Sequence, residues 1–172
     1  RSVTAKVILP GSGFLSASAT TILISVVAMK GDYAFIGTEF EDDAGGTESG
    51  KLYIFNVTNG ALVKTLDNPN GYGTTVGDRF TGYPSAGSTI SVHNNYLAVG
   101  TPLEDDAGGT NSGKVYIFET TTGDWSDTTL IRTLNNPNAF GTSLDDNFGR
   151  SLTLFGNYCV VSAPYEDDTG TD

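Results

Sequence analysis

The stretch FEDDAGGTESGKLYIF, residues 40–55, indicates the fold because it recurs, with three changes, as LEDDAGGTNSGKVYIF at residues 103–118. Thirteen of the sixteen positions are identical, and the two copies lie 63 residues apart. A third copy begins as YEDDTGTD at residues 165–172. Repetition at a long, fixed period is typical of tandem structural units that share one design.

Other segments recur around this acidic block. It is preceded by YAFIGT (33–38), YLAVGT (96–101) and YCVVSA (158–163), and it is followed by KTLDNPN (64–70) and RTLNNPN (132–138). The segments after the block lie 68 residues apart, and an insertion near GDWSDTT (123–129) explains the difference. The repeat is therefore a whole structural unit and not a short motif.

Each unit predicts four short strands. In the last unit LTLF (152–155) turns through Gly156-Asn157 into YCVV, and Gly31-Asp32 and Asn94-Asn95 hold the same place earlier. These residues tolerate the positive φ that a tight two-residue hairpin requires. In GKVYIF (113–118) two alternating sets of apolar side chains predict a strand covered on both faces. The fourth strand is expected at TLIRTL (129–134).

The fold class is therefore all-β, and β-propeller blades of four antiparallel strands are the favoured architecture. A two-sheet sandwich is the main rival, whereas β-helix rungs are far shorter than this period. We expect one propeller segment over residues 1–172, divided into units at approximately 1–25 (partial), 26–87, 88–150 and 151–172 (partial). Because 172/63 is about 2.7 repeats, the segment is expected to belong to a larger propeller or to be completed by other copies.

Composition narrows the range of partners. With 9 basic and 20 acidic residues the net charge is −11, which disfavours nucleic acid and anionic membrane surfaces and leaves cations or basic proteins. The longest apolar stretch, residues 21–29, is about half of a membrane span and is interpreted as a strand, so no membrane insertion is expected. The single cysteine, Cys159, excludes an internal disulfide and is expected to be an inert buried thiol.

The recurring segments resemble the FG-GAP repeat family, the blade type of integrin α-chain propellers. The FG element is similar to Phe148-Gly149, with weaker versions at Phe80-Thr81 and Phe14-Leu15. The GAP element is similar to Ser162-Ala163-Pro164, Gly100-Thr101-Pro102 and Gly37-Thr38-Glu39, and a G-x-x-Y-x-F strand follows at 50–55 and 113–118. The resemblance covers nearly all of residues 26–172.

The wording of the repeats is also similar to FG-GAP-type repeats in surface proteins of aquatic bacteria and in virion structural proteins. The resemblance implies adhesion or ligand recognition at an extracellular, cell-surface or virion-surface location. The calcium loop that integrin-type blades carry between the FG and GAP elements is replaced here by a short hairpin, so that site is not transferred.

The acidic blocks are the candidate metal ligands: Asp42, Asp43, Asp105, Asp106, Asp167 and Asp168. Adjacent carboxylates with Thr and Ser oxygens suit calcium, the only cofactor expected. The alternating carboxylates of known calcium loops are missing, however, so the same residues could instead cap turns. Either way the blocks are expected to project from one rim.

Catalysis is not expected. A glycosidase needs one unique carboxylate pair, whereas these carboxylates recur in every unit. A serine triad would depend on the only histidine, His93, and no nucleophile elbow is present. Trp125 lies in the unrepeated insertion, where an exposed aromatic side chain would serve binding; a hydrophobic anchor at a blade edge is the alternative.

Three functions follow. The first is a non-enzymatic interaction or adhesion module that binds a protein or glycan through propeller loops. The second is a structural subunit that joins other copies by strand complementation into a ring or filament, because unpaired strand edges invite strand addition. The third is an accessory propeller domain of a larger enzyme.

Overall fold

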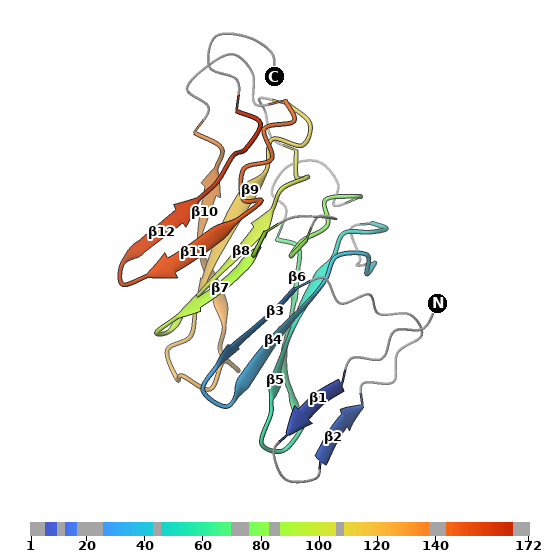
Figure 1. The fold of residues 1–172 in the computed structure, drawn as a ribbon, viewed down its shortest axis with the longest axis vertical. Coiled ribbons are helices and arrows are strands. Elements are labelled where there is room, and N and C mark those ends of the chain that lie inside the picture. Colours follow the sequence, from blue (N-terminus) through green and yellow to red (C-terminus); the bar gives the residue numbers. More distant parts are fainter. Residues whose placement is uncertain are drawn as a thin grey trace.

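The computed structural model describes residues 6–9, 13–16, 26–42, 46–69, 76–82, 87–105, 109–137 and 144–166. Two four-stranded antiparallel sheets form its centre (Figure 1). Sheet I contains β3 (Val26–Lys30), β4 (Tyr33–Thr38), β5 (Lys51–Asn56) and β6 (Leu62–Asp67). Sheet II contains β7 (Ile90–His93), β8 (Tyr96–Thr101), β9 (Lys114–Glu119) and β10 (Thr129–Asn135). In both sheets the strands lie in sequence order, which confirms the predicted four-stranded unit.

Two hairpins flank the sheets. The C-terminal hairpin pairs β11 (Leu152–Phe155) with β12 (Tyr158–Val161), and it repeats the first two strands of each sheet. At the other end β1 (Lys6–Leu9) pairs with β2 (Gly13–Ser16). Phe14-Leu15, the weakest FG candidate, therefore lies within a strand, and not in a segment between units.

The first strands of successive units lie beside one another. β7 is in contact with β3 on one side and with β11 on the other (Figure 1). The tight turns before the second strands have the predicted geometry, since Gly31, Asn94 and Gly156 have φ of 55°, 52° and 57°. Positive φ at the first turn position matches the twist of the two paired strands.

Alternating side chains bury both faces of sheet II. Leu97, Val99, Tyr116 and Phe118 belong to one hydrophobic cluster together with residues of sheet I. Ala98 and Val115 point the other way and pack with Phe148 and Leu152. Burying one large apolar side chain stabilises a fold by roughly 1.5–3 kcal/mol, so these two clusters hold the successive units together. The prediction of a third strand covered on both faces is confirmed.

Aromatic rings join the two sheets directly. Phe35 of β4 and Trp125, from the β9–β10 loop, lie edge to face with ring centroids 4.8 Å apart. Phe80, in the segment that connects the sheets, lies 6.0 Å from the ring of Tyr116. In the described part of the chain no helix has the length and apolar character needed to cross a membrane.

Candidate interaction rim

The acidic blocks lie in the β4–β5 and β8–β9 loops, at the opposite end of the sheets from the β3–β4 and β7–β8 turns. We define the rim as these two loops (39–42 with 46–50, and 102–105 with 109–113) and the connecting segments 76–82 and 144–150. Because both loops follow the second strand of their sheet, they emerge at equivalent places, as the repeat predicted.

Each connecting segment is held to the acidic loop by backbone hydrogen bonds. The amides of Gly77, Arg79 and Phe80 donate to the carbonyls of Thr47, Glu48 and Ser49 over 3.0, 3.1 and 2.7 Å. In sheet II the amides of Asp145, Asn147 and Phe148 donate to Thr110, Asn111 and Ser112 over 2.9, 3.1 and 3.0 Å. The FG element therefore ends a short connecting segment that is hydrogen-bonded along the acidic loop. We call this hydrogen-bonded segment the FG clamp.

Two glycines make this clamp possible. Gly50 and Gly113 both have φ of +82°, which L side chains rarely adopt. A Cβ atom on Gly113 would lie 2.1 Å from the carbonyl oxygen of Phe148, and one on Gly50 would lie 2.3 Å from that of Phe80. The first residue of the G-x-x-Y-x-F strand is thus required by the close approach of the FG backbone.

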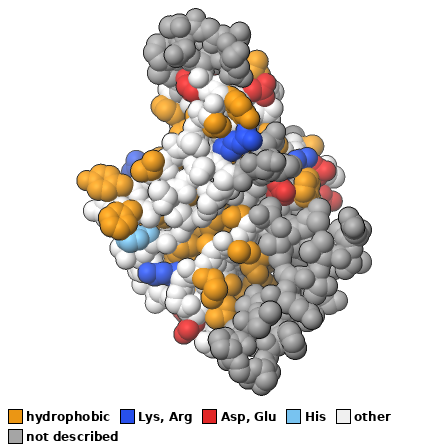
Figure 2. Space-filling view, in the orientation of Figure 1, with side chains coloured by type: hydrophobic (Ala, Val, Ile, Leu, Met, Phe, Trp, Pro, Cys, Tyr) orange, Lys and Arg blue, Asp and Glu red, His pale blue; other side chains and the backbone are white. Residues whose placement is uncertain are grey.

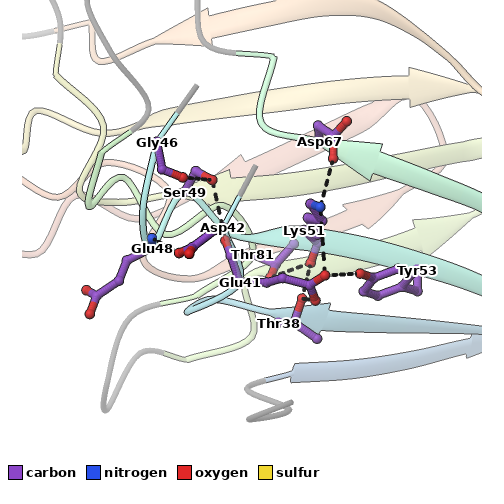
Figure 3. A network of polar contacts seen from close by, with 10 residues as sticks. All are labelled: Thr38, Glu41, Asp42, Gly46, Glu48, Ser49, Lys51, Tyr53, Asp67 and Thr81. Carbon is purple, nitrogen blue, oxygen red and sulfur yellow. Dashed lines mark hydrogen bonds and ion pairs between the residues drawn. The ribbon is translucent and has the colours of Figure 1, made fainter. Parts of the chain in front are cut away.

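In sheet I the first carboxylate of the block is the centre of a polar network (Figure 3). Glu41 accepts hydrogen bonds from the hydroxyls of Tyr53 and Thr38, and the Lys51 ammonium lies 3.7 Å from its Oε1 atom. Lys51 also lies 3.8 Å from Asp67. Burial and the adjoining Glu41 raise the pKa of the Tyr53 hydroxyl.

Sheet II repeats this network in a buried setting. Glu104 Oε1 accepts hydrogen bonds from Lys114 Nζ at 2.8 Å and from the Tyr116 hydroxyl at 2.5 Å. The Glu104 side chain is fully buried, and burial raises its pKa against the opposing effect of Lys114. These residues were not predicted as functional, although their spacing is one signal: Lys and Tyr follow the first Glu by 10 and 12 positions in both units.

The second residue of the block stabilises the loop. Asp42 Oδ1 accepts a hydrogen bond from the amide of Glu48, and Asp105 Oδ1 accepts one from the amide of Asn111, both at 2.9 Å. This geometry agrees with the turn-capping interpretation for these two carboxylates. The other candidates, Asp43, Asp106, Asp167 and Asp168, lie outside the described residues. Within the described ranges no group of three or more His, Cys, Asp or Glu side chains is placed to hold a metal ion.

A carboxylate that sequence analysis missed lies where the two units meet. Asp78 is buried, and its Oδ2 atom accepts a hydrogen bond from Asn68 Nδ2 at 3.1 Å. Burial, together with the nearby charges of Glu104 and Asp105, raises the pKa of Asp78 to about 8, despite the opposing charge of Lys114. Asn136 donates to Asp146 in the same way over 2.6 Å, so the Asn–Asp pair is also part of the repeat.

The expectation of an exposed Trp125 is wrong. Its side chain is only 2% exposed and packs against Phe35. This packing agrees with the alternative interpretation, in which Trp125 is a hydrophobic anchor. The loop that carries it is held by Asp127, whose carboxylate accepts hydrogen bonds from the hydroxyls of Thr120, Thr121 and Thr122. These hydrogen bonds lower the pKa of Asp127. The insertion therefore places an indole between the sheets.

The remaining single residues also have assigned places. His93 ends β7 and lies with its ring 5.5 Å from that of Phe155. Cys159 is half-buried and not fully buried as expected, and it lines a cavity; burial raises the pKa of its thiol.

Comparison with protein-family models supports the family resemblance for the second half of the chain. Residues 77–118 and 139–172 match the model of the FG-GAP repeat. Each match contains an FG-like element, a GAP-like element and the strand pair that connects the two. A search of curated proteins finds no match to the chain. Residues 77–172 therefore carry two repeats of the FG-GAP family.

Proposed function

We propose that the chain is a non-enzymatic interaction or adhesion module of a cell or virion surface, which binds a protein or glycan partner through the rim. One observation carries this proposal: equivalent carboxylates do the same structural work in both units. Asp42 and Asp105 each hold their own loop, and Glu41 and Glu104 each bind a Lys and a Tyr. Carboxylates used in this way build a scaffold, and they leave recognition to the residues that vary.

The variable positions lie at the solvent side of the rim. In sheet I the exposed Glu48 forms an ion pair with Arg79, with Nη2 and Oε2 2.9 Å apart. In sheet II the equivalent Asn111 donates a hydrogen bond from Nδ2 to Asp145 at 2.7 Å. The two units thus present different charges on one backbone frame, which suits recognition of an extended partner.

Calcium binding by the acidic blocks belongs to the same proposal. The block residues Asp42, Asp43, Asp105, Asp106, Asp167 and Asp168 supply the hard oxygen atoms that calcium prefers. Calcium would then order the loops that surround the variable positions. Millimolar calcium should raise the melting temperature of the chain if the ion binds the folded state, and an unchanged melting temperature would remove calcium from the proposal.

The test is a binding screen of the labelled chain on glycan arrays and on cells, with and without calcium. Rim variants Arg79→Ala and Asp145→Ala should lose binding, whereas Asp32→Ala, in the turn at the opposite end of sheet I, should retain it. Loss of binding in Asp32→Ala alone would place recognition elsewhere. Catalytic turnover that one unrepeated acidic residue abolishes would overturn the non-enzymatic assignment.

A second candidate, assembly with other copies by strand addition, is favoured by the C-terminal hairpin. Among the described strands β12 pairs only with β11, whereas β4 and β8 each pair on both sides. An open strand edge is a template for an added strand. Analytical ultracentrifugation at high protein concentration would exclude this candidate if the measured molar mass remains that of a monomer.

A further inference from the structure

One exposed aliphatic side chain lies on the rim in each unit. Val76 and Leu144 are 57% and 51% exposed. They hold equivalent positions, because each directly precedes the first amide of the FG clamp, that of Gly77 in one unit and that of Asp145 in the other. Single exposed apolar side chains are ordinary on protein surfaces, whereas two at the same place of a repeat are a feature of the unit.

Each of these aliphatic residues lies close to a glycine of the acidic loop. A Cβ atom on Gly46 would lie 2.4 Å from Cγ2 of Val76, and one on Gly109 would lie 2.9 Å from Cα of Leu144. Cβ contacts under 3.0 Å essentially never occur, so this approach requires glycine at both places. The FG clamp fixes the backbone that follows. Both aliphatic residues are therefore held in place before a partner binds, which lowers the entropic cost of binding.

The rim around these side chains is strongly acidic. Its segments contain nine Asp or Glu residues and two Arg residues. Asp42, Glu48 and Asp145 are exposed, whereas Arg79 and Arg150 are only partly exposed. Most of the acidic side chains that Figure 2 shows lie at the upper and right margins, where the acidic loops project in Figure 1. The rim therefore attracts a partner with Lys or Arg side chains, and it repels a second copy of this acidic chain.

The aromatic rings of the rim favour a polypeptide over a glycan. The C–H groups of a sugar ring pack on an open aromatic face, where the π-electrons are. The guanidinium carbon of Arg79 lies 4.6 Å from the ring centroid of Phe40 and covers that ring, and Phe80 and Phe148 are buried. Within the described rim segments the exposed apolar surface is thus aliphatic, which suits the apolar side chains of a polypeptide.

We propose that the rim binds an extended polypeptide segment that carries both aliphatic and basic side chains. The aliphatic side chains of the partner pack on Val76 and Leu144, and its Lys or Arg side chains pair with the carboxylates of Asp42 and Asp145. Because these groups recur in consecutive units, one extended segment meets both sets. This inference rests on the proposed function and chooses a protein over a glycan as the partner.

The probe is a displayed library of random linear peptides that is selected on the full chain. Peptides that also bind a chain carrying both Val76→Ser and Leu144→Ser are removed. This double variant should fold, because both side chains are more than half exposed, and an unchanged melting temperature checks this. The remaining peptides should contain aliphatic residues and more Lys and Arg than Asp and Glu. Leu144→Ser alone should weaken their binding about tenfold, because the leucine contact is lost.

Two matched variants serve as controls. Leu62 is 52% exposed and begins β6, at the end of sheet I opposite to the rim, so Leu62→Ser should bind the selected peptides as the wild type does. Asp145→Asn should weaken binding about two- to fivefold at low salt and less at high salt, as for an exposed ion pair. Asp32→Asn, in the turn at the opposite end of sheet I, should leave binding unchanged.

The outcomes separate this inference from the proposed function. If no peptide remains after removal, or if Leu62→Ser weakens binding as much as Leu144→Ser, the aliphatic contact is overturned. An excess of acidic residues in the remaining peptides would overturn the charge pairing. Glycan binding that Asp145→Ala abolishes, without selected peptides, would support the proposed function and overturn this inference. Binding of neither peptides, glycans nor cells would overturn both.

Discussion

Gly113 shows how a single residue position can be dictated by the backbone of a segment that lies 35 positions away in the sequence. It has a φ of +82°, and any Cβ would approach the Phe148 carbonyl oxygen to 2.1 Å. Gly113→Ala therefore combines left-handed strain with a collision against backbone. We expect it to lower the free energy of unfolding by about 3 kcal/mol or more, measured by urea denaturation.

Gly123 is the matched control. Its φ is +76°, but a Cβ there would meet nothing within 4 Å. Gly123→Ala carries only the conformational cost, so we expect a loss of about 1 kcal/mol. Equal losses in the two variants would show that the FG clamp does not approach Gly113 as described.

The raised pKa of Asp78 predicts that the stability of the folded chain depends on pH. Its pKa of about 8 in the folded chain exceeds the ordinary value of 3.8, so between these values the folded state holds a proton that the unfolded state lacks. Stability is greatest in acid with respect to this group and falls as pH rises through about 8. The groups that face Asp78 are Asn68, Glu104, Asp105, Lys114 and Tyr116.

The measurement is the free energy of unfolding at pH 5.5 and pH 8.5. We expect the wild-type chain to lose roughly 1–3 kcal/mol over this interval, with part of the slope due to Glu104. Asp78→Asn should flatten the slope, because the amide does not titrate. Asp145→Asn, at an exposed position on the rim, should keep the wild-type slope, and an unchanged slope in Asp78→Asn would contradict the assignment.

At the scale of elements, the acidic loops are held by their own side chains. The Asp105 carboxylate accepts a hydrogen bond from the backbone amide of Asn111, six residues later in the sequence. Asp105→Ala should therefore cost about 1 kcal/mol and speed hydrogen exchange of the Asn111 amide. Asp105→Asn should lose less, since the amide oxygen still accepts. Exchange at Asn111 that is as slow in Asp105→Ala as in the wild type would contradict the capping role.

The strands and turns could be predicted from the sequence because their causes are local. Alternating apolar residues and two-residue turns such as Asn94-Asn95 mark the hairpins, and the repeat shows that each unit follows one design. Trp125 could not be placed this way, because its burial depends on Phe35, which lies 90 positions earlier in the chain. An unrepeated loop with Asp and Thr looks solvated until its packing partner is known.

Long-range pairs explain the other omission. Asp78 meets Asn68 of one unit and Glu104 of the next, so its burial is a property of the junction and not of its neighbours in sequence. More of the contact among Glu41, Lys51 and Tyr53 could be predicted from the sequence. Its spacing recurs in both units, and alternate residues of one strand share a face, so Lys51 and Tyr53 had to lie together.

At the scale of the molecule, consecutive units bury one another's apolar faces. Sheet II has neighbours on both sides, and its side chains divide between two clusters. Where no described element covers a face, apolar side chains stay exposed, as at Val27 and Met29 of β3. The stability of a unit should therefore depend strongly on the unit beside it.

The contact between Phe35 and Trp125 gives the most direct test of this account. A double-mutant cycle with Phe35→Leu and Trp125→Leu measures whether the two rings stabilise the chain jointly. Their edge-to-face packing across the sheets predicts a coupling free energy of about 0.5–1.5 kcal/mol. Losses that add without coupling, within about 0.3 kcal/mol, would contradict the claim that neighbouring units pack face to face through these side chains.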